Sequence, residues 1–406
     1  MDDAPNPAAG QELGMQAPIS QEAPGHANTL PNIFSLADMV FSLPDERQAR
    51  FGHIFHFTST VGQVVVPPAM ETWIRERLGA LELVEEQYII RVTNLVTMEG
   101  ALFNELRALR PASPPLPEHV TELVQAEPGD PFCEPQALTP ADTFAHEEVP
   151  PGRVRGTYCI TASSLVKIDG YHGLVIFDEH NPLRIGYDQL SDYLDTAWRW
   201  AELAHQEDPQ ARFYLVIWNS LPRAAAAVVH GHLQMLLTRD VHYPQVEAWR
   251  RAAETYRQSY SRGYFDDLFE VHADLGLGFT RQGARVMASL TPLAERERLI
   301  MADVQDYACP GAFSQPFKRA LFLALDSFIN RMHVTAFNLA IYVPPLAETS
   351  QAWRGFPAIA RLVDRGHPHD QVSDIGAMEL YAASVINSDP FRVAEALRAA
   401  FEHAPT

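Results

Sequence analysis

Residues 228–237, with the sequence VVHGHLQMLL, place two histidines and a glutamine at alternate positions in an apolar run. In a β-strand, side chains two residues apart project from the same face, so His230, His232 and Gln234 should share one face. Four consecutive alanines, Ala224–Ala227, precede this run, and small residues let a ligand approach the backbone closely. The pattern therefore predicts a strand that forms the floor of a polar site.

Three explanations fit the polar residues on this face. The histidines could be hydrogen-bonded core residues, or they could be a His-x-His metal pair, which needs further ligands. They could also carry nucleophilic catalysis at phosphorus, because a neutral imidazole is a good nucleophile when its second nitrogen donates to an acceptor such as a backbone carbonyl. We favour this third explanation, in which Gln234 donates to a phosphate oxygen and stabilises the developing charge. Since glutamine cannot act as a general acid, the leaving group should depart unaided, as a sugar phosphate does.

The elements around this strand alternate between strands and helices. Residues 173–177 and 212–218 are typical of strands, and the segment from Tyr187 to His205 places apolar residues at helical spacing. The loop of nine residues before the histidine strand is too short for a helical crossover, so the two flanking strands should pair as an antiparallel hairpin or lie as near neighbours. After residue 245 a similar order of elements follows. We therefore predict an α+β fold with two related halves, each an antiparallel sheet packed by helices, plus an N-terminal extension.

The domain organisation follows from composition. The chain has 406 residues, 47% of them hydrophobic, which is enough for one large or two medium domains. Residues 1–32 are rich in Pro, Ala, Gly and Gln and are expected to be disordered. Residues 33–100 form an N-terminal extension to which the sequence assigns no role. The catalytic half is expected at residues 101–245 and the second half at residues 246–406.

The composition also argues against several classes of protein. The net charge of −20 disfavours binding to nucleic acid or to an anionic membrane. No apolar run approaches the roughly 18 residues that span a bilayer, and the acidic N-terminus lacks the features of a secretory signal. Three cysteines are too few for a disulfide framework and favour a reducing compartment. We expect a cytoplasmic protein that acts on small molecules.

Residues 219–234, NSLPRAAAAVVHGHLQ, resemble the active-site segment of the galactose-1-phosphate uridylyltransferase-like branch of the histidine-triad (HIT) superfamily. In that branch an asparagine stands eleven residues before a His-x-His-x-Gln motif, as Asn219 does here. The resemblance implies that His232 becomes covalently nucleotidylated and that Gln234 and Asn219 contact phosphates. The stretch FNELRALRP resembles the family's Arg-x-x-Arg-Pro segment, in which Arg107 and Arg110 would reach phosphates.

The resemblance also implies a metal site. The segment GLVIFDEHNPL resembles the strand and turn that carry a zinc-ligand histidine, here His180, and His230 matches a second ligand. The family's site often begins with Cys-x-x-Cys, whereas here Cys133 is followed by Gln136 at the place of a second thiolate. Either Cys133, His180 and His230 hold zinc with a fourth, oxygen ligand, or the site is empty and is held together by hydrogen bonds.

Other positions depart from the family's pattern. Leu339 and Ile341 occupy the positions of the family's second metal site, so no second iron or zinc site is expected. Ala227 stands where a serine often contacts phosphate. The base-recognition segment is not recognisable in residues 161–173, TASSLVKIDGYHG, where Lys167 is either a phosphate contact or a solvated charge. The nucleobase is therefore open.

The motif His-x-His-x-Gln occurs a second time in residues 366–374, GHPHDQVSD. This copy has no asparagine at the matching distance, no loop of small residues before it and no apolar strand after it. We interpret it as a polar loop that could face the active site from the second half. Replacing His232 should abolish activity, whereas replacing His369 should at most reduce it.

The functional prediction is a nucleotidyltransferase of the hexose-1-phosphate uridylyltransferase kind. His232 attacks the α-phosphorus of a nucleoside diphosphate sugar, a sugar 1-phosphate leaves, and a second phosphorylated acceptor takes the nucleotidyl group. One alternative is a phosphorylase of a nucleoside diphosphate sugar or a dinucleoside polyphosphate, with inorganic phosphate as the acceptor. Another is a non-catalytic nucleotide sensor, which Ala227 and the incomplete thiolate pair favour. Because the family often dimerises, a homodimer is a further expectation.

Overall fold

The computed structural model describes residues 30–79, 81–108, 124, 129–302, 313–370 and 372–402. The predicted disordered segment lies outside these ranges except for residues 30–32, and Arg110 lies outside them as well. Asn32 caps the first helical turn by accepting hydrogen bonds from the backbone of Phe34 and Ser35. None of the described helices combines the length and the apolar composition that crossing a bilayer requires.

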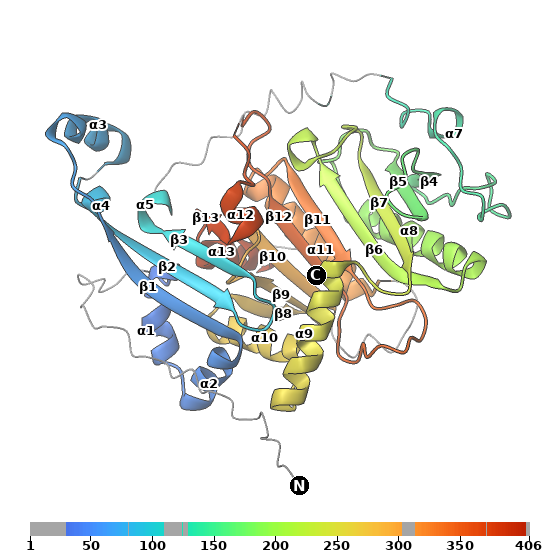
Figure 1. Cartoon of the computed structure of the whole chain (residues 1–406). Coiled ribbons are helices and arrows are strands. Elements are labelled where there is room, and N and C mark those ends of the chain that lie inside the picture. Colours follow the sequence, from blue (N-terminus) through green and yellow to red (C-terminus); the bar gives the residue numbers. More distant parts are fainter. Residues whose placement is uncertain are drawn as a thin grey trace, which may run out of the picture.

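A nine-stranded sheet forms the centre of the molecule (Figure 1). Its order is β4-β5-β7-β6-β11-β12-β10-β9-β8, and every neighbouring pair is antiparallel. The strands are β4 (Cys159–Ser163), β5 (Tyr171–Phe177), β6 (Ala211–Ser220), β7 (His232–Arg239), β8 (Gly278–Arg281), β9 (Ala284–Ala288), β10 (Glu295–Ala302), β11 (Phe337–Tyr342) and β12 (Ile359–Asp364). The predicted antiparallel pairing of the two strands around the alanine loop is confirmed as β6 and β7.

The two halves share this sheet instead of packing face to face. Strands β4 to β7 come from the first half and β8 to β12 from the second, and β6 pairs with β11 at the join. In this pairing Asn219 of β6 stands opposite Asn338 of β11. The α+β prediction with an antiparallel sheet in each half is confirmed, and edge-to-edge fusion places residues of the second half beside the histidine strand.

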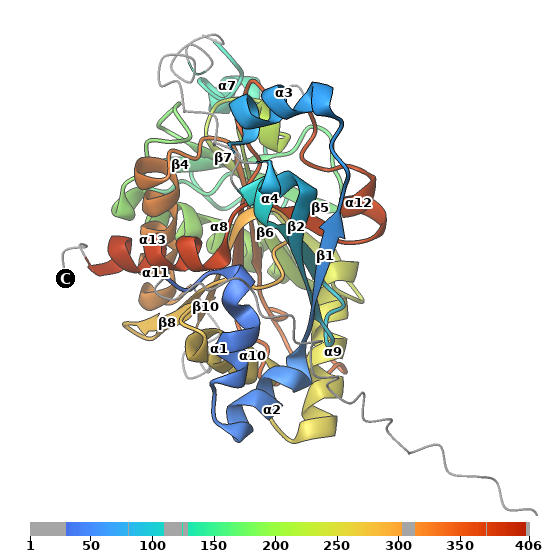
Figure 2. The same ribbon diagram turned by 90° about the vertical axis from the view of Figure 1, so that its left-hand side faces the viewer.

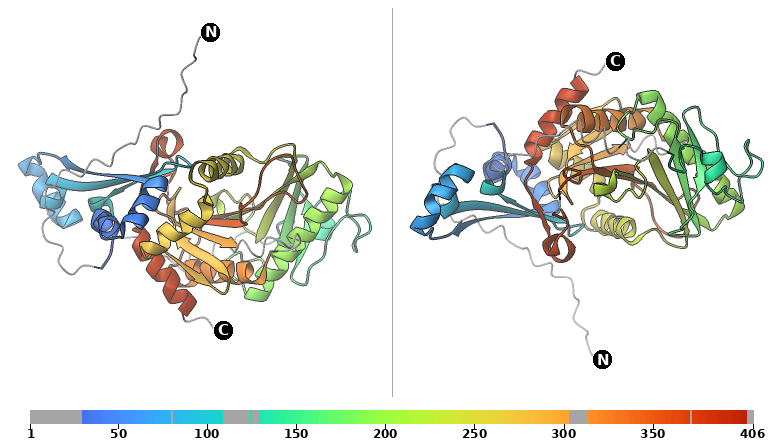
Figure 3. Two further views of the ribbon diagram at one scale, coloured as in Figure 1. Left: turned by 90° about the horizontal axis from the view of Figure 1, so that it is seen from below. Right: turned by 90° about the horizontal axis from the view of Figure 1, so that it is seen from above.

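Helices cover both faces of the main sheet (Figure 3). Helices α8, α11 and α13 pack on one face, where Tyr193 and Trp200 of α8 join Trp218 of β6 in the core. On the other face, Trp249 of α9 packs against Tyr342 of β11 and under the Arg361 guanidinium of β12. The helices are α8 (Tyr187–Glu207), α9 (Pro244–Tyr260), α10 (Tyr264–Asp274), α11 (Gln315–Asp326), η4 (Ser327–Arg331) and α13 (Pro390–Glu402). The predicted helix from Tyr187 to His205 is thus confirmed.

A second sheet of four strands, β1-β2-β3-β13, stands beside the first (Figures 1 and 2). Its strands are β1 (Phe55–Gln63), β2 (Glu86–Asn94), β3 (Gly100–Asn104) and, parallel to β3, the C-terminal β13 (Ser384–Ile386). The N-terminal extension is therefore completed by a strand from the far end of the chain. The shorter helices are η1 (Ile33–Ser35), α1 (Leu36–Phe41), α2 (Asp45–Ile54), α3 (Pro68–Leu78), α4 (Glu82–Glu85), α5 (Glu105–Ala108), α7 (Pro135–Leu138), η2 (Pro222–Ala224) and α12 (Ala377–Tyr381).

Candidate active site and metal centre

The histidine motif spans the start of β7, with His230 in the preceding loop and His232 as the first residue of the strand. A tight loop with left-handed residues at Leu221 and Ala225 leads from β6 through η2 to His230, and β7 begins at His232. Between the two histidines, the Gly231 N–H donates to the His180 carbonyl at 3.1 Å. A Cβ at Gly231 would lie 2.4 Å from the Phe177 ring, so this position requires glycine. A proline there would also lose the bond to His180, which explains why the active motif lacks the proline of the second copy.

His232 is held in one orientation and one tautomer. Its Nδ1 lies 2.8 Å from the His230 carbonyl, so Nδ1 carries the proton and donates. The other nitrogen, Nε2, has no hydrogen-bond partner in the described part of the chain, and the side chain is 6% exposed. Burial lowers the pKa of His232 below its ordinary value and keeps the ring neutral near pH 7. A neutral ring with a free Nε2 lone pair has the properties of a nucleophile.

Gln234 lies on the same face as His232, and a hydrogen bond to His172 of β5 orients its side-chain amide. Across the β5–β7 ladder its Oε1 lies 3.1 Å from Nε2 of His172. The Nδ1 of His172 accepts the backbone N–H of Ile168 at 3.1 Å, so the ring proton is on Nε2 and is donated to Gln234. The amide NH₂ of Gln234 therefore points away from His172.

Asn219 is oriented by the second half of the molecule. The register that pairs Ile217 with Gln234 brings Asn219, two residues further along β6, level with His232 at the start of β7. The Oδ1 of Asn219 accepts from Nδ2 of Asn338 at 2.7 Å, and Oδ1 of Asn338 accepts from the Arg365 guanidinium at 2.5 Å. Because arginine only donates, this chain of bonds fixes both amides, and Nδ2 of Asn219 makes one long bond, donating to the Ala225 carbonyl at 3.5 Å.

Four side chains converge beside His232 in a group suited to a cation. They are Asp130, Cys133, His180 and His230, and their ligand atoms all lie within 4.8 Å of one another. Individual separations run from 3.1 Å between the two histidine Nδ1 atoms to 3.8 Å between Cys133 Sγ and Asp130 Oδ2. Zinc bonded at about 2.3 Å to sulfur and about 2.0 Å to nitrogen gives tetrahedral edges of roughly 3.3–3.6 Å. The arrangement therefore has the dimensions of a tetrahedral zinc site.

The histidine tautomers support the same conclusion. Nε2 of His180 donates to the Val124 carbonyl at 2.9 Å, and Nε2 of His230 donates to the Phe177 carbonyl at 2.8 Å. Both Nδ1 atoms are consequently unprotonated and face each other, which is the way that outer hydrogen bonds orient metal ligands. Without a cation, burial and the nearby Asp130 carboxylate raise the pKa of the Cys133 thiol. A divalent cation would offset that repulsion and stabilise the thiolate.

The fourth member of this group was missed by sequence reasoning. Gln136, which stands where a thiolate follows Cys133 in the family's Cys-x-x-Cys pattern, lies exposed on α7. Asp130 joins instead, three residues before Cys133. The signal was present as Asp-x-x-Cys, the same spacing with the carboxylate in the first position. The expected oxygen ligand is thus available.

An aromatic side chain stands over the face that carries His232. The ring of Phe132 meets the His232 imidazole edge-on at 5.2 Å between centroids. Phe132 also packs on the apolar patch that Ile160, Leu174 and Ile176 form beside the catalytic strand. The segment that supplies Asp130 and Cys133 therefore also covers His232.

The other predicted residues lie elsewhere. Arg107 is exposed on α5, where its Nε donates to Asn387 at 3.3 Å, and the described residues show no contact between it and His232. The second motif forms an exposed turn, in which the His369 N–H donates to Nδ1 of His367 at 3.3 Å. This turn is tied to the first half because Arg223 of η2 donates to the Arg365 carbonyl at 2.8 Å. It therefore borders the loop of Asn219 and lies outside the His232 group.

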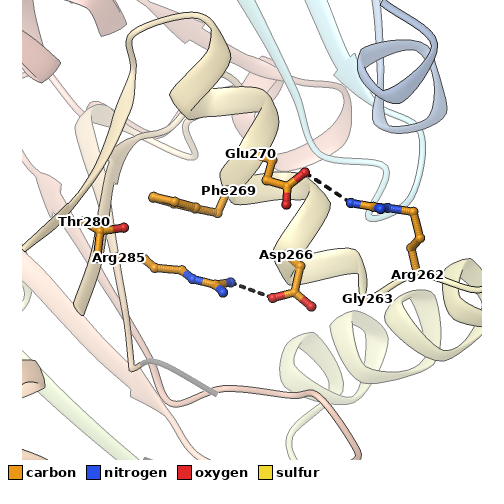
Figure 4. Close-up of a pocket in the computed structure, with 7 residues that line it drawn as sticks. All are labelled: Arg262, Gly263, Asp266, Phe269, Glu270, Thr280 and Arg285. Carbon is orange, nitrogen blue, oxygen red and sulfur yellow. Dashed lines mark hydrogen bonds and ion pairs between the residues drawn. The ribbon is translucent and has the colours of Figure 1, made fainter. Parts of the chain in front are cut away.

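A surface cavity of ≈ 580 Å³ lies in the second half and involves none of these residues (Figure 4). Its two arginines are already neutralised, since Arg285 pairs with Asp266 at 2.7 Å and Arg262 pairs with Glu270 at 3.1 Å. The candidate site is therefore the His232 region, where two amides held by hydrogen bonds lie on strands beside an unprotonated imidazole nitrogen.

Comparison with known proteins settles the fold. No family model and no curated protein sequence matches the chain. Among solved structures, an ADP-glucose phosphorylase from Arabidopsis thaliana with bound ADP-glucose aligns with a TM-score of 0.56 at 17% identity, covering 77% of this chain and 98% of that one. The fold is that of the galactose-1-phosphate uridylyltransferase-like HIT proteins.

Two further structures agree with this fold. A GalT-like protein from Arabidopsis thaliana aligns with a TM-score of 0.52 at 18% identity, covering 66% of this chain and 91% of that one. A uridylyltransferase aligns with a TM-score of 0.51 at 14% identity, covering 77% of this chain and 99% of that one. The HIT-like fold predicted from the motif at residues 219–234 is confirmed.

Proposed function

We propose that this protein is a nucleotidyltransferase that acts on a nucleoside diphosphate sugar through a covalent nucleotidyl-His232 intermediate. Nε2 of His232 attacks the α-phosphorus, a P–N bond forms, and the P–O bond to the sugar phosphate breaks. The sugar 1-phosphate leaves with the electron pair of that bond. A second phosphorylated acceptor then attacks the same phosphorus and restores the free imidazole, so that the kinetics are ping-pong.

The state of His232 carries this proposal. Its Nδ1–H is committed to the His230 carbonyl, and its Nε2 lone pair is unpaired within the described residues. The carbonyl also stabilises the positive charge that the ring acquires on nucleotidylation, because Nδ1 keeps its proton. The NH₂ group of Gln234 is directed away from His172, and that of Asn219 makes only one long bond, to the Ala225 carbonyl, so both can donate to non-bridging phosphate oxygens.

We further propose that Asp130, Cys133, His180 and His230 hold zinc. Four ligands in a tetrahedral arrangement, with no position left open, are typical of a structural site. When bound, the metal would fix the turn at His230 and thereby the carbonyl that orients His232. The residues of this chain perform the chemistry, and the ion supplies rigidity to the loop that carries them.

The test is incubation with a panel of nucleoside diphosphate sugars followed by intact-mass measurement. A stable mass increase equal to one nucleotidyl group, which is a nucleoside monophosphate less one water, absent in His232→Asn, supports the proposal and identifies the base. No adduct with any member of the panel would instead favour a nucleotide-binding sensor. Exchange of labelled sugar 1-phosphate, compared with labelled inorganic phosphate, into the nucleoside diphosphate sugar then distinguishes a transferase from a phosphorylase.

A further inference from the structure

His172 lies outside the resemblance-based set of site residues, yet it is built into the same face. It is 3% exposed and stands on β5, two residues before Leu174, which lies opposite Gln234. Both ring nitrogens are engaged, since Nδ1 accepts from the Ile168 N–H and Nε2 faces Gln234 Oε1, each at 3.1 Å. The ring thus bridges the loop after β4 to the catalytic strand.

The hydrogen bond that Nδ1 of His172 accepts determines that Nε2 of the same ring is a donor. A neutral imidazole has one donor and one acceptor nitrogen. Because the Ile168 N–H can only donate, Nδ1 must be the acceptor and Nε2 must carry the proton. Nε2 of His172, as a donor, can bond only to the oxygen of the Gln234 amide. The NH₂ group of that amide must therefore point away from His172. The reverse orientation of the amide would place two donors against each other.

Hydrogen bonds hold the loop after β4 against His172. The Ser164 N–H donates to the His172 carbonyl at 3.0 Å, and Nζ of Lys167 donates to the same carbonyl at 3.2 Å. Lys167 also donates to Ser163 Oγ at 2.8 Å. These bonds hold the Ile168 N–H in place above the ring. Both of these Lys167 bonds therefore stabilise the loop, and neither involves Gln234.

We infer that His172 is a positioning residue for the proposed nucleotidyl transfer, which fixes the Gln234 amide so that its NH₂ donates to the phosphate at His232. This inference rests on the proposed function for its effect on rate, and on the geometry alone for the amide orientation. His172 does not touch the reacting atoms and acts only through Gln234. Burial lowers the pKa of His172, which is consistent with a neutral ring at physiological pH.

A double-mutant cycle tests the effect on rate. Single-turnover formation of nucleotidyl-His232 should slow about tenfold in His172→Phe and be largely restored in His172→Gln, whose amide nitrogen can stand near the Nε2 position. In the Gln234→Ala background, His172→Phe should cause no further loss. A merely structural role would slow both backgrounds equally, and that additivity would overturn the inference.

His242 provides a matched control. It is 2% exposed, its Nδ1 accepts a backbone N–H from Tyr243, and its Nε2 donates to the Tyr214 carbonyl. His242→Phe removes the same pair of bonds from a site that involves no amide side chain, so the rate of nucleotidyl transfer should be unchanged in the folded fraction.

The orientation can be measured without any substrate. ¹⁵N NMR of histidine-labelled wild-type protein should show His172 as the Nε2–H tautomer, and its signals should shift in Gln234→Ala. An Nδ1–H tautomer, or signals indifferent to Gln234→Ala, would overturn the inference. If no donor nucleotidylates His232, the proposed function fails, whereas this measurement still decides the orientation.

Discussion

At the scale of the residue, the decisive property is which nitrogen of each histidine carries the proton. His232 has its proton on Nδ1, while His180 and His230 have theirs on Nε2, and in each case a backbone carbonyl accepts it. Under the proposed function, the same residue type is thereby divided between a nucleophile, His232, and two metal ligands, His180 and His230. The sequence shows the histidines, but only the positions of the carbonyls decide their tautomers.

The first residue-scale prediction separates the two histidine motifs. His232→Asn should abolish nucleotide addition, because the asparagine lacks a nucleophilic nitrogen, whereas His369→Ala should lower the rate at most a few-fold, since His369 lies in an exposed turn. Intact mass and single-turnover rates measure both. An active His232 variant together with an inactive His369 variant would reverse the assignment.

The second residue-scale prediction concerns the metal. Purified protein should contain about one zinc per chain, and Cys133→Ser or Asp130→Ala should release it to a chelator more readily and lower the melting temperature. Asp130→Cys restores a second thiolate and should slow that release. Glu134→Ala, which removes an exposed carboxylate next to the group, is the control. Equal metal content in wild type, Cys133→Ser and Asp130→Ala would show that these residues hold no ion.

At the scale of the element, the pairing of β6 with β11 connects the two halves through side-chain hydrogen bonds as well as through the sheet. Asn338 of β11 donates to both Asn219 Oδ1 and the Ala224 carbonyl, at 2.7 Å and 2.8 Å. Arg365 behind it is held by Asp374 through two hydrogen bonds of 2.5 Å and 3.0 Å. The second half thus orients Asn219 of the first half through Asn338.

Asn338 variants should show this contribution. Asn338→Ala and Asn338→Asp both remove the donor to Asn219, although only the alanine variant also removes the acceptor of the Arg365 Nη1 bond, while the two bonds to Asp374 remain. If orientation of Asn219 is what matters, both should slow nucleotidyl transfer by about five- to tenfold, the equivalent of roughly 1 kcal/mol. The exposed Asn330→Ala is the matched control. Wild-type rates in both Asn338 variants, beside a slow Asn219→Ala, would refute the role.

At the scale of the whole molecule, one continuous core and a buried ion cluster hold the two sheets together. Arg361 of β12 contacts Glu297 of β10 and reaches Glu99 beside β3, each at 2.7 Å. The residues of β13 then complete the small sheet from the C-terminal side. The N-terminal extension is consequently integrated with the second half, and we expect the chain to unfold as one cooperative unit.

Buried neutral histidines should make this unit sensitive to acid. Burial lowers the pKa of His272 to about 4, so the folded state stays neutral while the unfolded state binds a proton below about pH 6.5. Stability should therefore be greatest above pH 6.5 and decline as the pH falls towards 4. One such group gives a slope approaching 1.4 kcal/mol per pH unit.

Thermal melts between pH 6.5 and 5.5 measure this slope. His272→Gln should reduce the pH dependence because it removes the titrating group, even if it lowers stability at neutral pH through the lost bonds to Leu268 and Leu290. His56→Gln, at an exposed position, should leave the slope unchanged. An unaltered slope in His272→Gln would assign the acid sensitivity to other groups.

The sequence by itself determined the local part of this protein. Alternation in residues 228–237 identified β7 and the face shared by His232 and Gln234, and helical spacing identified α8, because both periods reflect burial within a single element. Tertiary structure alone decided which distant residues meet. It brought Asp130 to the metal group, His172 behind Gln234, and Asn338 behind Asn219. The last two contacts depend on strand order and register across the shared sheet, whereas Asp130 reaches its partners from a loop. No local pattern in a single chain encodes which strands become neighbours.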